Sequence, residues 1–331
     1  MTELVNARFM PRRPWVTGNL QTVADRIAPR THDLAGIATE RRLIVRMDDE
    51  SGDALAVRVH EPRIGPRPDR PVVLIVHGLG GSIDSTYVRA TSLGLLRAGY
   101  AVARVDLRGV GDSTEHCRTL YHGGRSGDLR SVLRALAEEP GSEGVAIVGF
   151  SLGGNVTLKL LGEPLEDIPV RGGVAVSAPL DLSIGNEHLR ARMFGLYERF
   201  LVNRIKADTA RSGLVLSVEE RAAVAKVRTL TQFDDLITAK HNGWRDAAEY
   251  YALNSSAQFL PRITVPTLVV HSLDDPMIAP GPYEAIDWGL LEATTPVRRA
   301  ITRHGGHVGF HERGEALPWY VSMTRRFLDS V

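Results

Sequence analysis

The chain has 331 residues, of which 43% are hydrophobic and 24% are charged, a composition typical of a globular protein with a sizeable core and not of a disordered one. Forty basic side chains against 39 acidic ones give a formal net charge of +1, which argues against a dedicated nucleic-acid-binding protein. The single cysteine, Cys117, cannot form an internal disulfide, so we expect a reducing, cytoplasmic location.

The N-terminal residues, MTELVNARFMPRRPW, are mildly basic and lack the apolar core of a secretory signal. We expect residues 1–40 to form an arm that packs on the body of the protein. Weak contact of Arg8–Arg13 with a membrane surface is an alternative, and salt should abolish it. The sequence contains no run of about 18 apolar residues, so we expect no membrane-spanning helix.

Strand and helix signals alternate in the next part of the chain. Residues 42–47 and 54–60 indicate a hairpin, and PVVLIVHG indicates a strand buried on both faces. Helices are then expected at 87–96, 128–138 and 152–161, and strands at 100–105, 145–148 and 174–177. This alternation predicts an α/β fold with a mostly parallel central sheet flanked by helices.

The pattern becomes helical between the sixth and seventh predicted core strands. Strand signals resume at 267–271 and 297–302, and residues 319–328 indicate a closing helix. We therefore predict a first core part at 41–179, a helical cap insertion at 180–262 and a second core part at 263–331. The cap is expected to cover the active site with the apolar residues Phe194, Leu196, Phe200 and Leu201.

A candidate nucleophile lies in Gly149-Phe150-Ser151-Leu152-Gly153, which matches G-x-S-x-G between a predicted strand and a predicted helix. In this context a tight turn exposes the serine, and the helix N-terminus provides amide groups where negative charge develops. We predict Ser151 as the nucleophile.

The loop after residues 72–76 reads His77-Gly78-Leu79-Gly80-Gly81-Ser82. A backbone N–H in this loop is expected to form one half of an oxyanion hole. We choose the N–H of Leu79 for this half and the N–H of Leu152 for the other. A dinucleotide-binding loop is excluded, because Ile83 stands where G-x-G-x-x-G requires its last glycine. No zinc-ligand spacing occurs either, so we expect no metal.

A serine nucleophile needs a base, and the base needs an orienting carboxylate. The loop after the strand predicted at 267–271 contains aspartates, and the loop after 297–302 contains histidines. With Ser151 they give the order Ser, Asp, His along the chain. We choose His307 as base over His304, and Asp275 as acid over Asp274.

Taken together, the motifs resemble the YheT-like esterase branch of the α/β-hydrolase fold superfamily. The resemblance rests on FMPRRPWVTGNLQT, HGLGGS, DLRGVGDS followed by LYHGG, GFSLGGN, FDDLITAKHNGWRDAAEYY and HGGHVGF. It implies cofactor-free hydrolysis of carboxylic esters by Ser151, Asp275 and His307. Asn19 departs from the branch, which tends to carry histidine there.

We therefore expect a serine esterase that acts through an acyl-enzyme on small-molecule esters or lipids with short to medium acyl chains. A thioesterase, an amidase, a phospholipase and a C–C hydrolase are alternatives on the same triad, since one fold supports several chemistries. A non-catalytic ligand-binding protein of the same fold is a further alternative. The oligomeric state is left open.

Overall fold

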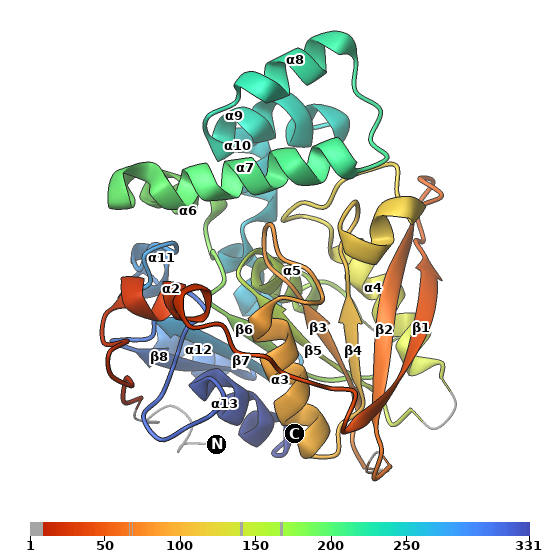
Figure 1. The fold of residues 1–331 in the computed structure, drawn as a ribbon, viewed down its shortest axis with the longest axis vertical. Coiled ribbons are helices and arrows are strands. Elements are labelled where there is room, and N and C mark those ends of the chain that lie inside the picture. Colours follow the sequence, from red (N-terminus) through yellow and green to blue (C-terminus); the bar gives the residue numbers. More distant parts are fainter. Residues whose placement is uncertain (1–8, 66, 68, 140–141, 166–167) are drawn as a thin grey trace.

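The computed structural model describes residues 9–65, 67, 69–139, 142–165 and 168–331. Within them, eight strands form one sheet in the order β1-β2-β4-β3-β5-β6-β7-β8 (Figure 1). The pairs β1–β2 and β2–β4 are antiparallel, and every pair from β4 to β8 is parallel. The strands are β1 (Ala38–Arg46), β2 (Ala54–Pro62), β3 (Val72–Val76), β4 (Val102–Val105), β5 (Val145–Phe150), β6 (Val170–Val176), β7 (Thr267–Ser272) and β8 (Val297–Thr302).

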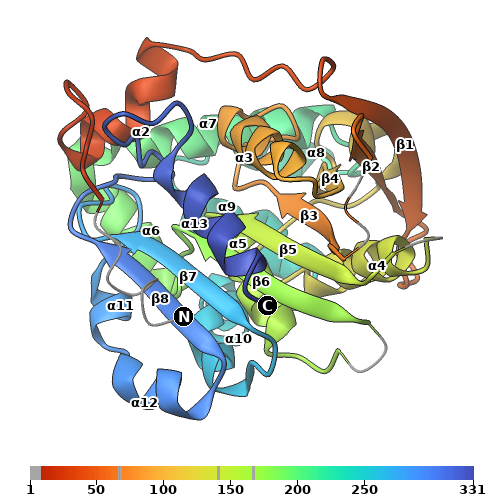
Figure 2. The same cartoon turned by 90° about the horizontal axis from the view of Figure 1, so that it is seen from below.

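Both faces of the sheet are covered, because alternate residues of one strand enter different apolar clusters. Val73 and Ile75 of β3 pack in one cluster, while Leu74 and Val76 pack in the other. Figure 2 shows α13 (Trp319–Leu328), which packs with α3 (Thr86–Arg97) on one face. The opposite face carries α4 (Ser126–Ala137), α5 (Leu152–Leu161) and α12 (Trp288–Thr294). The prediction of an α/β fold with a buried, mostly parallel sheet is confirmed.

A layer of helices, inserted in the sequence between β6 and β7, lies over one end of the sheet (Figure 1). Its apolar cluster includes Leu201, Ile205 and Phe233, and it also takes in Leu120 and Met277 from the surrounding loops. Its elements are α6 (Leu182–Ala191), the 3-10 turn η2 (Arg192–Gly195), α7 (Leu196–Arg211), α8 (Val218–Lys226), α9 (Leu230–Phe233), the π-helical turn η3 (Asp234–Ala239), α10 (Ala247–Asn254) and the 3-10 turn η4 (Ser256–Arg262).

The expected helical run is broken at η2, which changes the direction of one predicted lining residue. Met193, Phe194 and Gly195 have left-handed backbone angles, with φ of 49°, 54° and 72°. These angles interrupt the helical register, and the Phe194 side chain is 97% exposed. The prediction that Phe194 lines the site is therefore wrong.

The segments before β3 contain a helix that the sequence analysis missed. It is α2 (Gly18–Ile27), whose N-cap Thr17 accepts a hydrogen bond from the Leu20 amide. The short helices α11 (Gly281–Glu284) and α12 were missed as well. The predicted hairpin is confirmed by the antiparallel pairing of β1 and β2. Arg8 lies outside the described residues.

A buried cation joins the hairpin to the body. The Arg108 side chain is fully buried, and its guanidinium donates hydrogen bonds to three carboxylates, those of Asp49, Asp53 and Asp128. Cys117 lies nearby, where its buried Sγ donates to the Ala54 carbonyl at 3.2 Å. Burial raises the pKa of this thiol to about 11.

One glycine of α5 allows the helix to lie against the end of β3. A Cβ at Gly153 would lie 2.4 Å from the His77 carbonyl oxygen and 2.9 Å from that of Val76. Because backbone atoms cannot move aside cheaply, Gly153→Ala is expected to lower the free energy of unfolding by about 1–3 kcal/mol. Urea unfolding measures this change.

The matched control is Gly127→Ala in α4, where no atom lies within 4 Å of the added Cβ. Alanine has the higher helix propensity, so this variant should be more stable than the wild type by up to about 1 kcal/mol. Equal stability of the two variants would contradict the close approach of α5 to β3.

Candidate active site

Ser151 occupies the turn between β5 and α5. Its backbone is left-handed, with φ 51° and ψ −122°, a conformation that a residue with a side chain adopts only under constraint. The Ser151 amide donates to the Val176 carbonyl at 2.9 Å, which fixes the turn against the end of β6. Among the described residues, none makes a hydrogen bond with Ser151 Oγ, so this hydroxyl is available for reaction.

The loop after β3 lies directly beside this serine. A Cβ at Gly78 would lie 2.8 Å from the Ser151 Cβ, so only glycine allows this approach. The Gly78 carbonyl accepts from His77 Nδ1 at 2.8 Å and from the Gly81 amide at 3.0 Å. These two bonds fix the peptide group that carries the Leu79 N–H.

The amides on both sides of Leu79 are already paired. Gly78 N–H donates to the Tyr87 hydroxyl at 3.0 Å, and Gly80 N–H donates to the Tyr121 hydroxyl at 2.8 Å. Within the described part of the chain, the Leu79 amide has no such partner. Leu152 is the first residue of α5, so its N–H lacks an acceptor within the helix. Both amides are thus available to a negative oxygen.

The predicted acid and base lie in the loops after β7 and β8. His307 Nδ1 donates to Asp275 Oδ2 at 2.9 Å, which leaves Nε2 as the acceptor. Asp275 is fully buried, and its other oxygen accepts from the amides of Met277 and Ile278. Burial alone would raise the pKa of Asp275, but the charge of His307 and its hydrogen bond hold that pKa below the usual value.

The two alternative residues form a second pair. His304 Nδ1 donates to Asp274 Oδ2 at 3.1 Å, and the His304 side chain is 54% exposed. Asp274 also accepts from the Gly306 amide and so fixes the histidine loop. His307, and not His304, lines the cavity that contains Ser151.

That cavity has a volume of about 620 Å³ and brings together segments that are far apart in sequence. Leu79 lies on its wall with Ser151 and His307. Three of the four predicted cap residues line it, and Phe194 does not. Further apolar groups come from Val23, Met193, Met277 and Val308. Polar and charged groups come from Gln21, Thr22, Asp25, Arg26, Ser85, Thr86, Tyr87, Tyr197, Arg204 and His311.

Helix α2 contributes to this site, which the sequence analysis did not foresee. Thr22 Oγ1 accepts from the His307 amide at 2.8 Å, and Gln21 Oε1 accepts from the His311 amide at 2.6 Å. Between them Val308 and Phe310 have left-handed φ angles of 55° and 46°. Thr17 in VTGNLQT is an N-cap signal that predicts the helix, but no local signal shows its contacts.

Asn19, the departure from the family pattern, lies where α2 meets the helical layer. Its Oδ1 accepts from the Tyr197 hydroxyl of α7 at 2.9 Å. The Arg26 guanidinium lies 4.1 Å from the centre of the Phe200 ring. These contacts join α2 to α7 beside the cavity, and residues of both helices line it.

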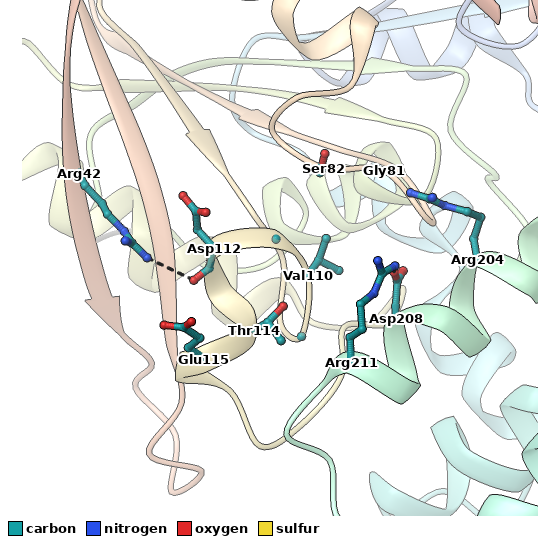
Figure 3. Close-up of a pocket in the computed structure, with 12 residues that line it drawn as sticks. Arg42, Gly81, Ser82, Val110, Asp112, Thr114, Glu115, Arg204, Asp208 and Arg211 are labelled. Carbon is teal, nitrogen blue, oxygen red and sulfur yellow. Dashed lines mark hydrogen bonds and ion pairs between the residues drawn. The ribbon is translucent and has the colours of Figure 1, made fainter.

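A second cavity of about 550 Å³ lies beside the first, lined by α7 and the 3-10 helix η1 (Gly111–His116) (Figure 3). Arg204 donates to the Gly80 carbonyl, and Arg211 pairs with Asp208. Arg42 donates to the Asp112 carbonyl. Neither Ser151 nor His307 lines this cavity. The first cavity is therefore the candidate active site.

The described residues contain no set of three or more His, Cys, Asp and Glu side chains arranged to hold a metal ion. No helix in the described ranges is both long enough and apolar enough to cross a membrane.

Comparison with known families gives a match over residues 71–314 to the model described as the alpha/beta hydrolase fold. The chain is 32% identical over 316 residues to "Putative esterase YheT" of Escherichia coli, covering 92% of this chain and 87% of that protein.

Two further proteins illustrate the range of similarity. The "Monoacylglycerol lipase" of Saccharomyces cerevisiae is 27% identical, over 81% of this chain and 61% of that protein. The solved structure of the Pyrococcus furiosus esterase Pf2001 covers 98% of both chains, with a TM-score of 0.63 and 18% identity. At that identity, the structural similarity shows the fold alone.

Proposed function

The chain belongs to the alpha/beta hydrolase fold family and is a YheT-like hydrolase of ester bonds, and from this premise we propose that Ser151, His307 and Asp275 form its catalytic triad. The observation that carries the proposal is the 2.9 Å bond from His307 Nδ1 to the buried Asp275, in the loop that borders the Ser151 cavity. We further propose that the helices at 180–262 act as a cap and that residues 9–40 pack on the body; the first eight residues of the predicted arm lie outside the described part of the chain.

The proposed reaction has two acyl-transfer steps. Ser151 Oγ attacks the ester carbonyl while His307 Nε2 takes its proton, and the N–H groups of Leu79 and Leu152 stabilise the oxyanion. The alcohol then leaves with the proton from His307. Water next attacks the acyl-enzyme, again with His307 as base, and releases the acid and Ser151.

The apolar side of the cavity supports esters with short to medium acyl chains. Leu196, Phe200 and Leu201 of α7 line this side together with Met277. An acyl chain placed along these side chains would be removed from water, which favours binding by about 0.8 kcal/mol per buried CH₂ group.

Labelling with a fluorophosphonate tests the proposal, since this reagent phosphonylates an activated serine. We expect one adduct, mapped by mass spectrometry to the peptide that contains Ser151, and none after heat denaturation. An adduct at another residue would contradict the assignment. Ester, thioester and amide substrates with one acyl group, compared at equal concentration, should show the ester to be hydrolysed fastest.

A further inference from the structure

The loop after β3, residues 77–82, is held by helix α7 of the helical layer as well as by the body. A Cβ at Gly80 would lie 2.8 Å from the Cβ of Arg204, so α7 lies directly against this loop. The Arg204 guanidinium donates two hydrogen bonds to the Gly80 carbonyl, from Nε at 3.1 Å and from Nη2 at 2.8 Å. Figure 3 shows this side chain extending from α7 toward Gly81. The two bonds fix the orientation of the Gly80 carbonyl.

Two peptide groups connect this carbonyl to the amide of Leu79. The Gly80 carbonyl shares a peptide group with the Gly81 N–H, which donates to the Gly78 carbonyl at 3.0 Å. The Gly78 carbonyl in turn shares a peptide group with the Leu79 N–H. Because a peptide group is planar, the direction of its carbonyl sets the direction of its N–H. Arg204 therefore helps to orient the Leu79 N–H without touching it.

The charge of Arg204 acts along the same path. A cation that donates to a carbonyl polarises its peptide group and makes the N–H of that group a stronger donor, and hydrogen bonds in series strengthen one another. Among the described residues no carboxylate forms a salt bridge with Arg204, so none cancels its charge at the loop. The last donor of this series is the Leu79 N–H, which faces the developing oxyanion in the proposed reaction.

A second contact from α7 holds the N–H of Gly80. The Tyr121 hydroxyl accepts from this N–H at 2.8 Å and donates to Asp208 Oδ2 at 3.3 Å. Asp208 follows Arg204 by four positions, so both lie on one face of α7. Burial first, and then the charge of Asp208, raises the pKa of Tyr121, so the hydroxyl keeps its proton for the carboxylate. A lone pair of the hydroxyl oxygen is then directed to the Gly80 N–H.

We propose that Arg204 and Tyr121 are positioning residues of the oxyanion hole, through which α7 orients the Leu79 N–H and strengthens it as a donor. This inference rests on the proposed function, because an oxyanion forms only if Ser151 attacks an ester carbonyl. Arg204 also lines the Ser151 cavity, whereas Tyr121 does not. Variants of both residues therefore separate an effect through the loop from a direct contact with substrate.

Steady-state kinetics with p-nitrophenyl butyrate test the two residues. Arg204→Met and Tyr121→Phe should each lower kcat by about 10- to 50-fold. This loss is smaller than the about 10²–10³-fold that follows removal of an oxyanion-hole donor, because the Leu79 N–H itself remains. KM should change less than about threefold, since both acyl-transfer steps use the hole and slow together. Arg204→Lys keeps a cation, and its kcat should exceed that of Arg204→Met by at least about threefold.

Arg199→Met is the matched control on the same helix. Arg199 is exposed and lines neither the Ser151 cavity nor the second cavity. This variant loses one positive charge of α7 without a contact to the loop, so its kcat and KM should equal those of the wild type.

Two ketones distinguish positioning from a merely structural role. The Ser151 oxygen adds to the carbonyl carbon of 1,1,1-trifluoro-2-octanone, His307 takes the serine proton, and the hemiketal oxyanion occupies the hole. The parent compound 2-octanone binds as the unreacted ketone. In Arg204→Met and Tyr121→Phe, Ki for the trifluoro ketone should rise by about the factor by which kcat/KM falls, while Ki for 2-octanone changes less than about twofold. An unfolded fraction of a variant lowers kcat and leaves both Ki values unchanged, so the ketones also decide the case of a variant that folds poorly.

Wild-type kcat in either variant would overturn the assignment of that residue. A higher KM at unchanged kcat would make Arg204 a substrate-binding residue, and an equal rise of Ki for both ketones would indicate a structural role; each result overturns the proposal. No hydrolysis by the wild type, together with no fluorophosphonate adduct at Ser151, would instead count against the proposed function.

Discussion

Replacement of Ser151 by alanine is expected to lower kcat for a chromogenic short-chain ester by about 10⁶-fold, the size of effect that follows loss of a triad nucleophile. The variant cannot form an acyl-enzyme, so only the oxyanion hole and substrate binding remain. Its Tm should stay within about 2 °C of the wild type, since Ser151 Oγ has no hydrogen bond to lose among the described residues and a surface-like change is worth at most ~0.5 kcal/mol.

Ser322→Ala is the control for this experiment. Its Oγ donates to the Trp319 carbonyl at 2.9 Å within α13, away from the cavity. We expect full turnover from this variant. Retention of more than one hundredth of the wild-type kcat by Ser151→Ala, with pure protein, would exclude Ser151 as the nucleophile.

Asp275→Asn is expected to lower kcat by about 10⁴-fold with little change in structure. The asparagine amide can donate to His307 Nδ1, which then becomes an acceptor and moves the ring proton to Nε2. A protonated Nε2 cannot take the proton of Ser151. Steady-state kinetics with a chromogenic ester measure the loss, and circular dichroism checks the fold.

Asp274→Asn provides a control on the adjacent residue, which pairs with the exposed His304 and lies outside the cavity. This variant should reduce kcat less than tenfold. The expected effect is a small shift of the histidine loop, whose Gly306 amide donates to Asp274. The opposite order of the two effects would make Asp274 and His304 the working pair.

The sequence predicts the ends of some elements well. The expected ends of β8, α5 and α13 coincide with those in the structure, because apolar runs and glycine or proline boundaries act locally. The helical layer was predicted only from the helical spacing of its apolar residues. The break at Met193 and Phe194 was missed because left-handed angles at two non-glycine residues depend on the surrounding contacts.

Prediction of the site has a similar limit. G-x-S-x-G and the loops after β3, β7 and β8 have local signatures, so Ser151, Leu79, Asp275 and His307 could be proposed from spacing. Asp25 and His311 line the same cavity but are 286 positions apart, and neither belongs to a motif. Their proximity depends on how α2 packs on the histidine loop, which periodicity and turn signals do not report.

The position of Cys117 has a practical consequence. Its sulfur is enclosed near the Arg108 cluster and remains protonated at physiological pH, with a pKa of about 11. Alkylating reagents attack the thiolate, so the native chain should react slowly with iodoacetamide. Cys117 is the only cysteine in the sequence. The rate at which the native protein is alkylated therefore measures how often the region between β2 and η1 opens.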